Sequence, residues 1–168
     1  MRYRLDVVAP SVVEVVTAAG GWLFDRVMAG WDVTVLVDGN DNSRPLQILG
    51  VQTGDLEDAL RAGQDGPRPD ALAVAAEVYG SDERVRHGVQ MALAGGNTEV
   101  TMWGRVWPSE LTRSVGDVEH RLSVAARAFK AQALAAASAP QDRVGDIEAF
   151  RTGMALCCPI AADLVPAS

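Results

Sequence analysis

Two histidines and a few carboxylates are the residues of this chain whose types could support acid–base chemistry. His87 and His120 each lie in a predicted helix beside charged neighbours, where an exposed histidine is the commoner state. Asp6, Asp38 and Glu77 are the carboxylates nearest to the ends of predicted strands. The serines indicate no nucleophile, because the chain contains no G-x-S-x-G turn. No recognisable catalytic constellation follows from the sequence.

The segment 29–41, AGWDVTVLVDGND, places an acid directly after a hydrophobic, β-branched run. Residues 30–39 are similar to the second strands of many Rossmann-like proteins, in which the terminal acid accepts hydrogen bonds from a ribose. That function also needs glycines after the first strand, where the backbone approaches the pyrophosphate. Residues 7–16, VVAPSVVEVV, contain no glycine. We therefore expect no bound nicotinamide or flavin and no other cofactor, and the start of a turn explains Asp38 equally well.

The residues that commonly bind metals are too few or wrongly spaced for a metal site. Residues 38–43, DGNDNS, lack the glycine and the glutamate that a calcium-binding helix–loop–helix requires at later positions. Cys157 and Cys158 are adjacent, so they do not readily form a disulfide with each other, and no C-x-x-C pair occurs. We expect no metal, and two free thiols in a reducing cytoplasm.

Charge and hydropathy exclude two classes of partner. The net charge of −7 repels phosphate backbones, so nucleic-acid binding is disfavoured. No run of eighteen apolar residues occurs, and Asp6, Pro10 and Glu14 interrupt the apolar N-terminal stretch that a signal peptide would need. A cytoplasmic protein without a membrane span is expected.

Hydrophobic periodicity predicts an alternation of strands and helices. Residues 71–78 are the ambiguous segment, because their alanine content favours a helix while their position favours a buried strand. The pair Gly20-Gly21 should weaken or kink the first helix. The predicted strands are 3–9, 32–38, 44–51, 71–78 and 97–107, and the predicted helices are 11–31, 54–63, 82–96 and 108–139.

This order, β-α-β-β-α-β-α-β-α, predicts a Rossmann-like α/β domain over residues 1–140. We expect three layers, with a mostly parallel sheet of about five strands between flanking helices. Strands 32–38 and 44–51 could pair as an antiparallel hairpin. Residues 141–168 are expected to form a C-terminal extension, with a weak helix at 144–154 and a loosely packed tail.

The expected fold points to the strand ends as the place for a ligand. In an open α/β sheet, ligands bind beyond the carboxyl ends of the strands. The candidate ligand-binding residues in the loops at those ends are Ser11, Asp38, Asp41, Ser81, Asp82 and Ser109.

The segment 102–108, MWGRVWP, carries a different signal. Aromatic residues and arginine are enriched at interaction surfaces, which makes Trp103, Arg105 and Trp107 candidate interaction residues. Alternatively, the two indole rings cover the edge of the sheet. The apolar seam from Leu111 to Phe129, spaced 4, 3, 4, 3, 4, could pack on the sheet or form a dimer interface.

Because no catalytic constellation stands out, the sequence favours a non-catalytic α/β module that binds a protein partner or a second copy of itself. The alternative is a small-molecule or nucleotide-binding domain, or an enzyme, with its site at the carboxyl ends of the strands.

Overall fold

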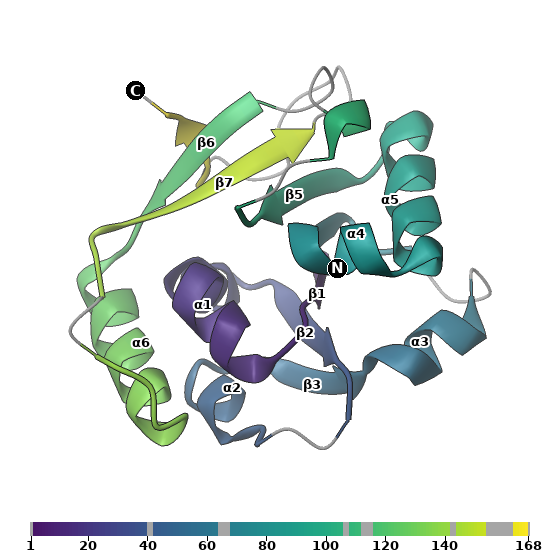
Figure 1. Ribbon diagram of the computed structural model, residues 1–168. Coiled ribbons are helices and arrows are strands. Elements are labelled where there is room, and N and C mark those ends of the chain that lie inside the picture. Colours follow the sequence, from purple (N-terminus) through teal and green to yellow (C-terminus); the bar gives the residue numbers. More distant parts are fainter. Residues whose placement is uncertain are drawn as a thin grey trace.

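The computed structural model describes residues 2–39, 42–63, 68–105, 108–111, 116–141, 144–153 and 163–167. These residues form one α/β domain, with an eight-stranded, mostly parallel sheet in the order β3-β2-β1-β4-β5-β7-β6-β8 and flanking helices (Figure 1). The strands are β1 Arg4–Val8, β2 Asp32–Val37, β3 Gln52–Asp55, β4 Ala71–Ala75, β5 Glu99–Trp103, β6 Gly116–Arg121, β7 Ile147–Gly153 and β8 Val165–Pro166. The helices are α1 Val12–Met28, α2 Arg44–Ile48, α3 Leu56–Ala62, α4 Ala76–Ser81, α5 Glu83–Gly95 and α6 Val124–Ala136, and a 3₁₀ turn spans Ser109–Leu111.

The N-terminal half is the parallel part of the sheet. Strands β3, β2, β1, β4 and β5 pair in parallel, with Val7 opposite both Val35 and Ala73. Alternate residues such as Leu5 and Val33 are almost completely buried beneath α1. Figure 1 shows α1, α2 and α6 on one side of these strands and α3 and α5 on the other. The expectation of a mostly parallel, helix-covered sheet is therefore confirmed, but the described sheet has eight strands instead of about five, and the expected Rossmann-like order is not confirmed.

Helix α1 begins where the sequence predicts it. The Ser11 side chain accepts a hydrogen bond from the Glu14 backbone N–H at 3.2 Å, which caps the helix. The helix runs unbroken through Gly20 and Gly21, because both glycines pack closely against neighbouring side chains and neither acts as a hinge. Gly21 lies against Leu122, where a Cβ atom would come within 2.2 Å of the leucine side chain.

The expected strand 44–51 and its hairpin are wrong. Residues 44–48 form helix α2, which Pro45 favours because proline suits the first turn of a helix. The next strand is β3, and it pairs with β2 in parallel, since α2 reverses the chain between them.

Residues 71–78 are part strand and part helix. The strand β4 ends at Ala75, and α4 begins at Ala76. A new helix, α5, then begins at Glu83, where Asp82 accepts hydrogen bonds from the backbone N–H groups of Arg84 and Val85. The strand expected from the position of this segment therefore forms its first part, and the helix favoured by its alanine content forms the rest.

The long helix predicted over 108–139 is wrong. Among the described residues of this range, Val124–Ala136 are α-helical, Ser109–Leu111 form a 3₁₀ turn, and Gly116–Arg121 form the antiparallel strand β6. The apolar seam is therefore not one helix face: Val118 lies on the strand, and Phe129 lies on α6 and stacks on Phe24 of α1.

The weak helix predicted at 144–154 is also wrong. Residues 147–153 form β7, which lies between β5 and β6 and pairs with both in antiparallel orientation. Strand β7 therefore joins the parallel and antiparallel parts of a single sheet.

A buried ion pair between Lys130 and Glu148 fixes α6 and β7 against α1. Glu148 on β7 accepts hydrogen bonds from the backbone N–H groups of Gly21 and Trp22, at 3.0 and 2.7 Å. Lys130 on α6 donates to the same carboxylate and to the Thr17 carbonyl oxygen, each at 2.7 Å. Burial raises the pKa of Glu148, while the Lys130 charge and the two N–H donors favour its ionised form. The pair thus ties α6 and β7 to the middle of α1.

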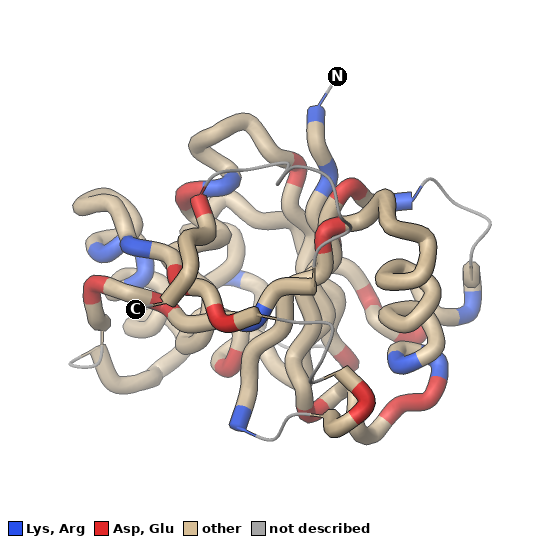
Figure 2. Tube along the Cα trace, turned by 90° about the horizontal axis from the view of Figure 1, so that it is seen from above, with Lys and Arg blue, Asp and Glu red and all other residues tan. Residues whose placement is uncertain are grey.

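Acidic and basic residues are interspersed along the described chain (Figure 2). Within that part of the chain, no helix is long and apolar enough to cross a membrane.

Candidate functional site

A pocket of about 1020 Å³ opens at the carboxyl ends of β4 and β5. The N-terminal turns of α1, helix α4 and the residues that follow β5 enclose it. This is the place where open α/β sheets bind ligands. The lining residues are Glu14, Thr17, Ala18, Ala76, Glu77, Tyr79, Gly80, Arg86, Trp103, Gly104, Arg105, Pro108, Ser109 and Glu110.

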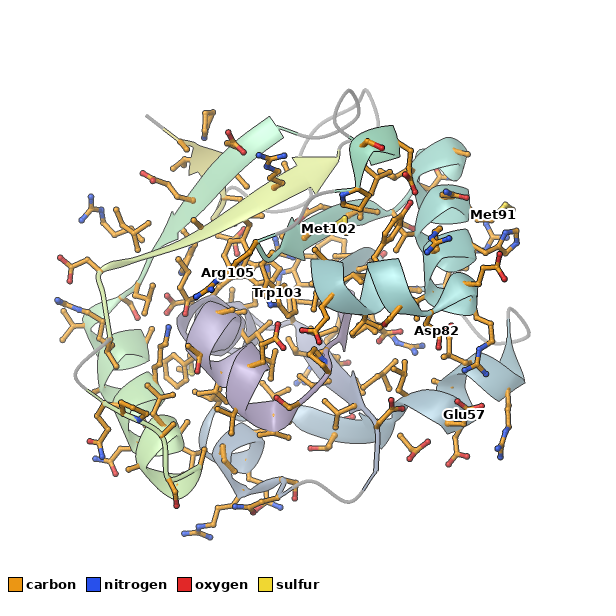
Figure 3. All side chains as sticks on the ribbon, viewed as in Figure 1. Glu57, Asp82, Met91, Met102, Trp103 and Arg105 are labelled. Atoms are coloured by element: carbon orange, nitrogen blue, oxygen red, sulfur yellow. The ribbon has the colours of Figure 1, made fainter. Side chains whose placement is uncertain are left out.

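The end of β5 positions two of these side chains. Trp103 is the last residue of β5 and pairs with Ala75, the last residue of β4. Gly104 follows with a φ of 138°, and a Cβ atom there would lie 2.9 Å from the Ala76 Cβ. Glycine is therefore required for the chain to pass this closely over the start of α4. Figure 3 shows Trp103 and Arg105 between α1 and the end of β5.

The indole of Trp103 carries an unpartnered donor. The residue is 4% exposed, and its Nε1 meets hydrogen-bond geometry with no acceptor in the described part of the chain. The indole nevertheless lies near enough to Glu14 to favour the ionised form of that carboxyl. A buried donor without a partner is costly, and Trp103 lines the pocket, so its N–H is available to an acceptor on a ligand.

Glu14 and Glu77 form a like-charged pair in the pocket. Burial raises the pKa of Glu14, and the neighbouring Glu77 carboxylate raises it further. Glu77 is exposed to solvent at the start of α4. Burial and the Glu77 charge therefore make Glu14 hold its proton more tightly than an ordinary glutamate does.

The far wall of the pocket is a hydrogen-bonded group around Tyr79. The Tyr79 hydroxyl donates to Glu110 at 3.1 Å and accepts from Gln90 at 3.2 Å. Burial and the bond to Glu110 raise the pKa of Tyr79, so the phenol is neutral at physiological pH. The Arg86 side chain donates to the Gly80 carbonyl oxygen and lies near the tyrosine ring. Arg105 is exposed at the opposite side of the pocket.

The structure brings together only some of the residues nominated from the sequence. Ser109 lines the pocket, and so do Trp103 and Arg105, which were nominated for a protein interface.

The other nominated residues lie elsewhere. Ser11 caps α1, Asp38 is exposed at the end of β2, and Ser81 ends α4. Asp82 caps α5 and pairs with Arg84. Asp41 and Trp107, and also Cys157 and Cys158, lie outside the described residues.

Several pocket residues were missed by the sequence reasoning. Glu14 follows Ser11 by three residues, the spacing of a capping box, which would have placed its carboxyl at a helix start beside a strand end. Tyr79, Arg86 and Glu110 carry no such local signal, because they meet only through the packing of α4, α5 and the turn at 109–111.

No family model matches this sequence, and no curated protein matches it. Solved structures do match it in fold. A triple mutant of the deacetylase Orf2 of the teicoplanin biosynthetic pathway is 14% identical, with a TM-score of 0.65 and 98% of each chain covered. A deacetylase–teicoplanin complex is 13% identical, with a TM-score of 0.66 over 90% of this chain and 98% of that one. The pseudoaglycone deacetylase Dbv21 is 14% identical, with a TM-score of 0.60 over 95% of this chain and 100% of that one.

These similarities overturn the expectation of a non-catalytic interaction module. The chains that share this fold over nearly their whole length are enzymes, and each is named a deacetylase. The alternative expectation fits better, namely a small-molecule-binding domain or enzyme with its site at the strand ends.

A zinc-inhibited form of teicoplanin deacetylase Orf2 is also similar in fold, with a TM-score of 0.55. Among the described residues of the present chain, no three His, Cys, Asp or Glu side chains converge, so these residues form no comparable metal site. The turn after β1 consists of Ala9, Pro10 and Ser11, which supply no imidazole, thiolate or carboxylate.

Proposed function

We propose that this protein is an enzyme that hydrolyses an acyl group from a small molecule held in the pocket at the ends of β4 and β5. The observation that carries the proposal is the buried, unpartnered Trp103 N–H beside the carboxyl pair of Glu14 and Glu77. The fold shared with deacetylases supports this reaction class.

The two carboxyls are suited to different steps of such a hydrolysis. Glu77, whose side chain is exposed, accepts a proton from water as the water oxygen attacks the acyl carbon. Glu14, whose pKa is raised, donates its proton to the departing nitrogen as the carbon–nitrogen bond breaks. The products are a carboxylic acid and an amine, and proton exchange with solvent restores both carboxyls.

Trp103 supplies the third component. Negative charge develops on the acyl oxygen during the attack, and a fixed donor in a water-poor site stabilises that charge. The indole N–H lies in the buried wall of the pocket near the Glu14 carboxyl, but it meets hydrogen-bond geometry with no described acceptor. It is therefore already prepared for an oxygen atom of the substrate.

The test measures hydrolysis of 4-nitroacetanilide and of N-acetylglucosamine, with the released amine as the readout. We expect Glu14→Gln and Glu77→Gln each to lower kcat/KM by about 10²- to 10⁴-fold, the usual contribution of general acid–base catalysis. Loss of activity on the alkaline side of the wild-type pH profile should follow the deprotonation of Glu14. Trp103→Phe should lower kcat more than it raises KM.

Glu83→Gln is the matched control, because Glu83 is an exposed acid of α5 outside the pocket. It should leave the rate unchanged. An active wild-type enzyme whose rate is insensitive to both Glu14→Gln and Glu77→Gln would contradict the proposal. Absence of any turnover, together with absence of binding of either compound to the wild-type protein, would contradict it as well.

A further inference from the structure

A second cavity lies on the opposite face of the sheet, between α3 and α5. Its volume is about 600 Å³, within the range of small-molecule sites. Strands β1, β2 and β4 form its floor, and the two helices form its walls. None of the residues of the first pocket lines it. The proposed hydrolase function gives this cavity no role.

The floor of this cavity is less well covered than the rest of the sheet. Leu36 and Leu72 are only partly buried there, whereas Val35 and Ala73, which face α1 from the same strands, are fully buried. The strands of a parallel sheet are normally covered on both faces. Part of the Leu36 and Leu72 side chains, which otherwise pack against the core, is therefore left uncovered in the floor by the described residues.

One wall of the cavity, helix α5, contains a glycine that lowers the stability of the helix. Gly88 lies in the middle of the thirteen-residue helix α5 and lines the cavity, and a Cβ atom there would meet nothing within 4 Å. Glycine in a helix interior costs about 1 kcal/mol relative to alanine. No close packing accounts for this glycine. A larger side chain at this position would project into the space between α3 and α5.

Arginine side chains, among them Arg84 and Arg68, line the cavity. Near the start of both helices, Arg84 forms ion pairs with Glu57 at 2.8 Å and with Asp82 at 3.1 Å; Figure 3 labels the two acids. Arg68 also lines the cavity, and it is exposed with no hydrogen bond or ion pair to any described residue.

Two carboxylates also line the cavity, but Asp6 pairs with the Arg4 side chain and Asp70 accepts a hydrogen bond from the Arg4 backbone N–H. A mainly apolar cavity with the uncommitted Arg68 guanidinium at its edge is complementary to an alkyl chain that carries an anionic head group.

We propose that this cavity binds an amphiphile with a single alkyl chain and a carboxylate head group, of which a fatty acid is the simplest example. The chain occupies the apolar space between α3 and α5, and the carboxylate pairs with Arg68. A helix or a second copy of the protein is a poorer occupant, because the volume is that of a small-molecule site.

The experiment titrates wild-type protein, labelled with ¹³C at the methionine methyl groups, with decanoate below its micellar concentration. Met91 lines the cavity, whereas Met28 ends α1 on the other face of the sheet and is 70% exposed. We expect a saturable shift of the Met91 methyl signal and none of the Met28 signal. Decyltrimethylammonium, which has the same chain and the opposite head-group charge, should bind more weakly.

Two variants identify the two parts of the site. Gly88→Leu should abolish the Met91 response to both amphiphiles, whereas Ala128→Leu, which adds the same side chain to an exposed position of α6, should not. Arg68→Glu should weaken decanoate binding by about fivefold, the effect of one exposed ion pair, without weakening decyltrimethylammonium binding.

Equal shifts of Met91 and Met28, or no saturable shift, would overturn the proposal in the wild-type protein, independently of how the variants fold. Equal binding of decanoate to wild-type, Gly88→Leu and Ala128→Leu proteins would do the same. A dimer that Gly88→Leu dissociates would identify a second copy as the occupant instead.

Discussion

Glu14 shows how one residue can have a structural and a chemical role. Its backbone N–H completes the cap of α1, while its carboxyl lies in the pocket beside Glu77 and Trp103. The backbone contact fixes the position of the residue, and burial with a like charge sets its protonation. This combination places a carboxyl with a raised pKa at the end of the sheet without any long-range sequence signal.

The raised pKa of Glu14 has a consequence for stability. A carboxyl that holds its proton more tightly in the folded state stabilises the protein below its unfolded pKa, and this contribution is lost as pH rises through the folded pKa. Glu14→Gln should therefore raise the Tm at neutral pH and leave it unchanged near about pH 4. Thermal unfolding followed by circular dichroism at the two pH values measures this.

Glu57→Gln is the control of opposite sign. The Arg84 side chain lowers the pKa of Glu57, so its contribution is present above the unfolded pKa and lost in acid. This variant should lower the Tm at neutral pH only. A Glu14→Gln protein less stable than wild type at neutral pH would refute the assignment.

At the scale of elements, α1 is the centre of the molecule because three other elements bond to its middle and end. Glu148 of β7 and Lys130 of α6 reach its central turns. Near its C-terminus, Asp25 accepts hydrogen bonds from the backbone N–H and the hydroxyl of Ser123, and its Oδ2 lies 2.8 Å from His120 Nε2. Helix α1 thus links the parallel strands to the antiparallel ones.

The two adjacent glycines of α1 should respond to alanine in opposite ways. A Cβ atom at Gly20 would make ordinary contacts of 3.4 to 3.5 Å, so Gly20→Ala should gain up to about 1 kcal/mol from helix propensity. At Gly21 the Cβ atom would come within 2.2 Å of Leu122, so Gly21→Ala should cost about 1–3 kcal/mol from overpacking. Urea denaturation of both variants tests the pair, and equal effects would refute the packing of α1 against Leu122.

The ion pair between Arg26 and Asp163 should matter more than an exposed one. Arg26 is buried and donates to Asp163 from Nε at 2.7 Å and from a terminal nitrogen at 2.9 Å. Burial opposes ionisation of Asp163, but the Arg26 bonds and charge outweigh it and lower the pKa of Asp163. Asp163→Asn should cost about 2–3 kcal/mol at neutral pH, less than a fully buried pair because the aspartate is partly exposed.

This contribution exists above the unfolded pKa of Asp163, so the difference between the two proteins should disappear as pH falls through the folded pKa. Asp146→Asn is the control, because Asp146 pairs with Arg127 at the surface and should cost less than about 1 kcal/mol. Equal losses for both variants, measured by denaturant titration, would argue against a structural role for Asp163.

At the scale of the whole molecule, the sheet combines a parallel half and an antiparallel half, and the parallel half lines both cavities. The first pocket opens at the carboxyl ends of β4 and β5, and the second cavity lies between α3 and α5. Because β7 contacts β5, the antiparallel half lies next to the strand whose end forms the first pocket.

Truncation tests how the chain is organised. A chain that ends at residue 140 lacks β7, so β5 and β6 lose the strand between them, and we expect no cooperative unfolding transition. A chain that ends at residue 164 lacks only β8, which pairs with β6 over two residues, and should unfold cooperatively. A folded 1–140 fragment would instead support the division into a domain and an extension.

The sequence predicted the elements whose signals are local. The Ser11 cap, the buried run at 32–37, the helix ending at Gly95-Gly96 and the strand-end location of the pocket all follow from short patterns. Parallel strands covered on both faces are continuously apolar, so β2 is recognisable from its own residues.

Only the tertiary structure decided the antiparallel half and the composition of the site. Strand β6, GDVEHR, buries chiefly one face, so it carries too few apolar residues to be recognised, while Leu111, Val118 and Phe129 mimic one helix. Strand β7 becomes a strand because β5 and β6 lie on either side of it. Glu14, Glu77 and Trp103 are likewise distant in sequence and meet only when β1, β4 and β5 align. Local patterns specify how each segment can fold, whereas pairing between distant segments specifies which side chains share a pocket.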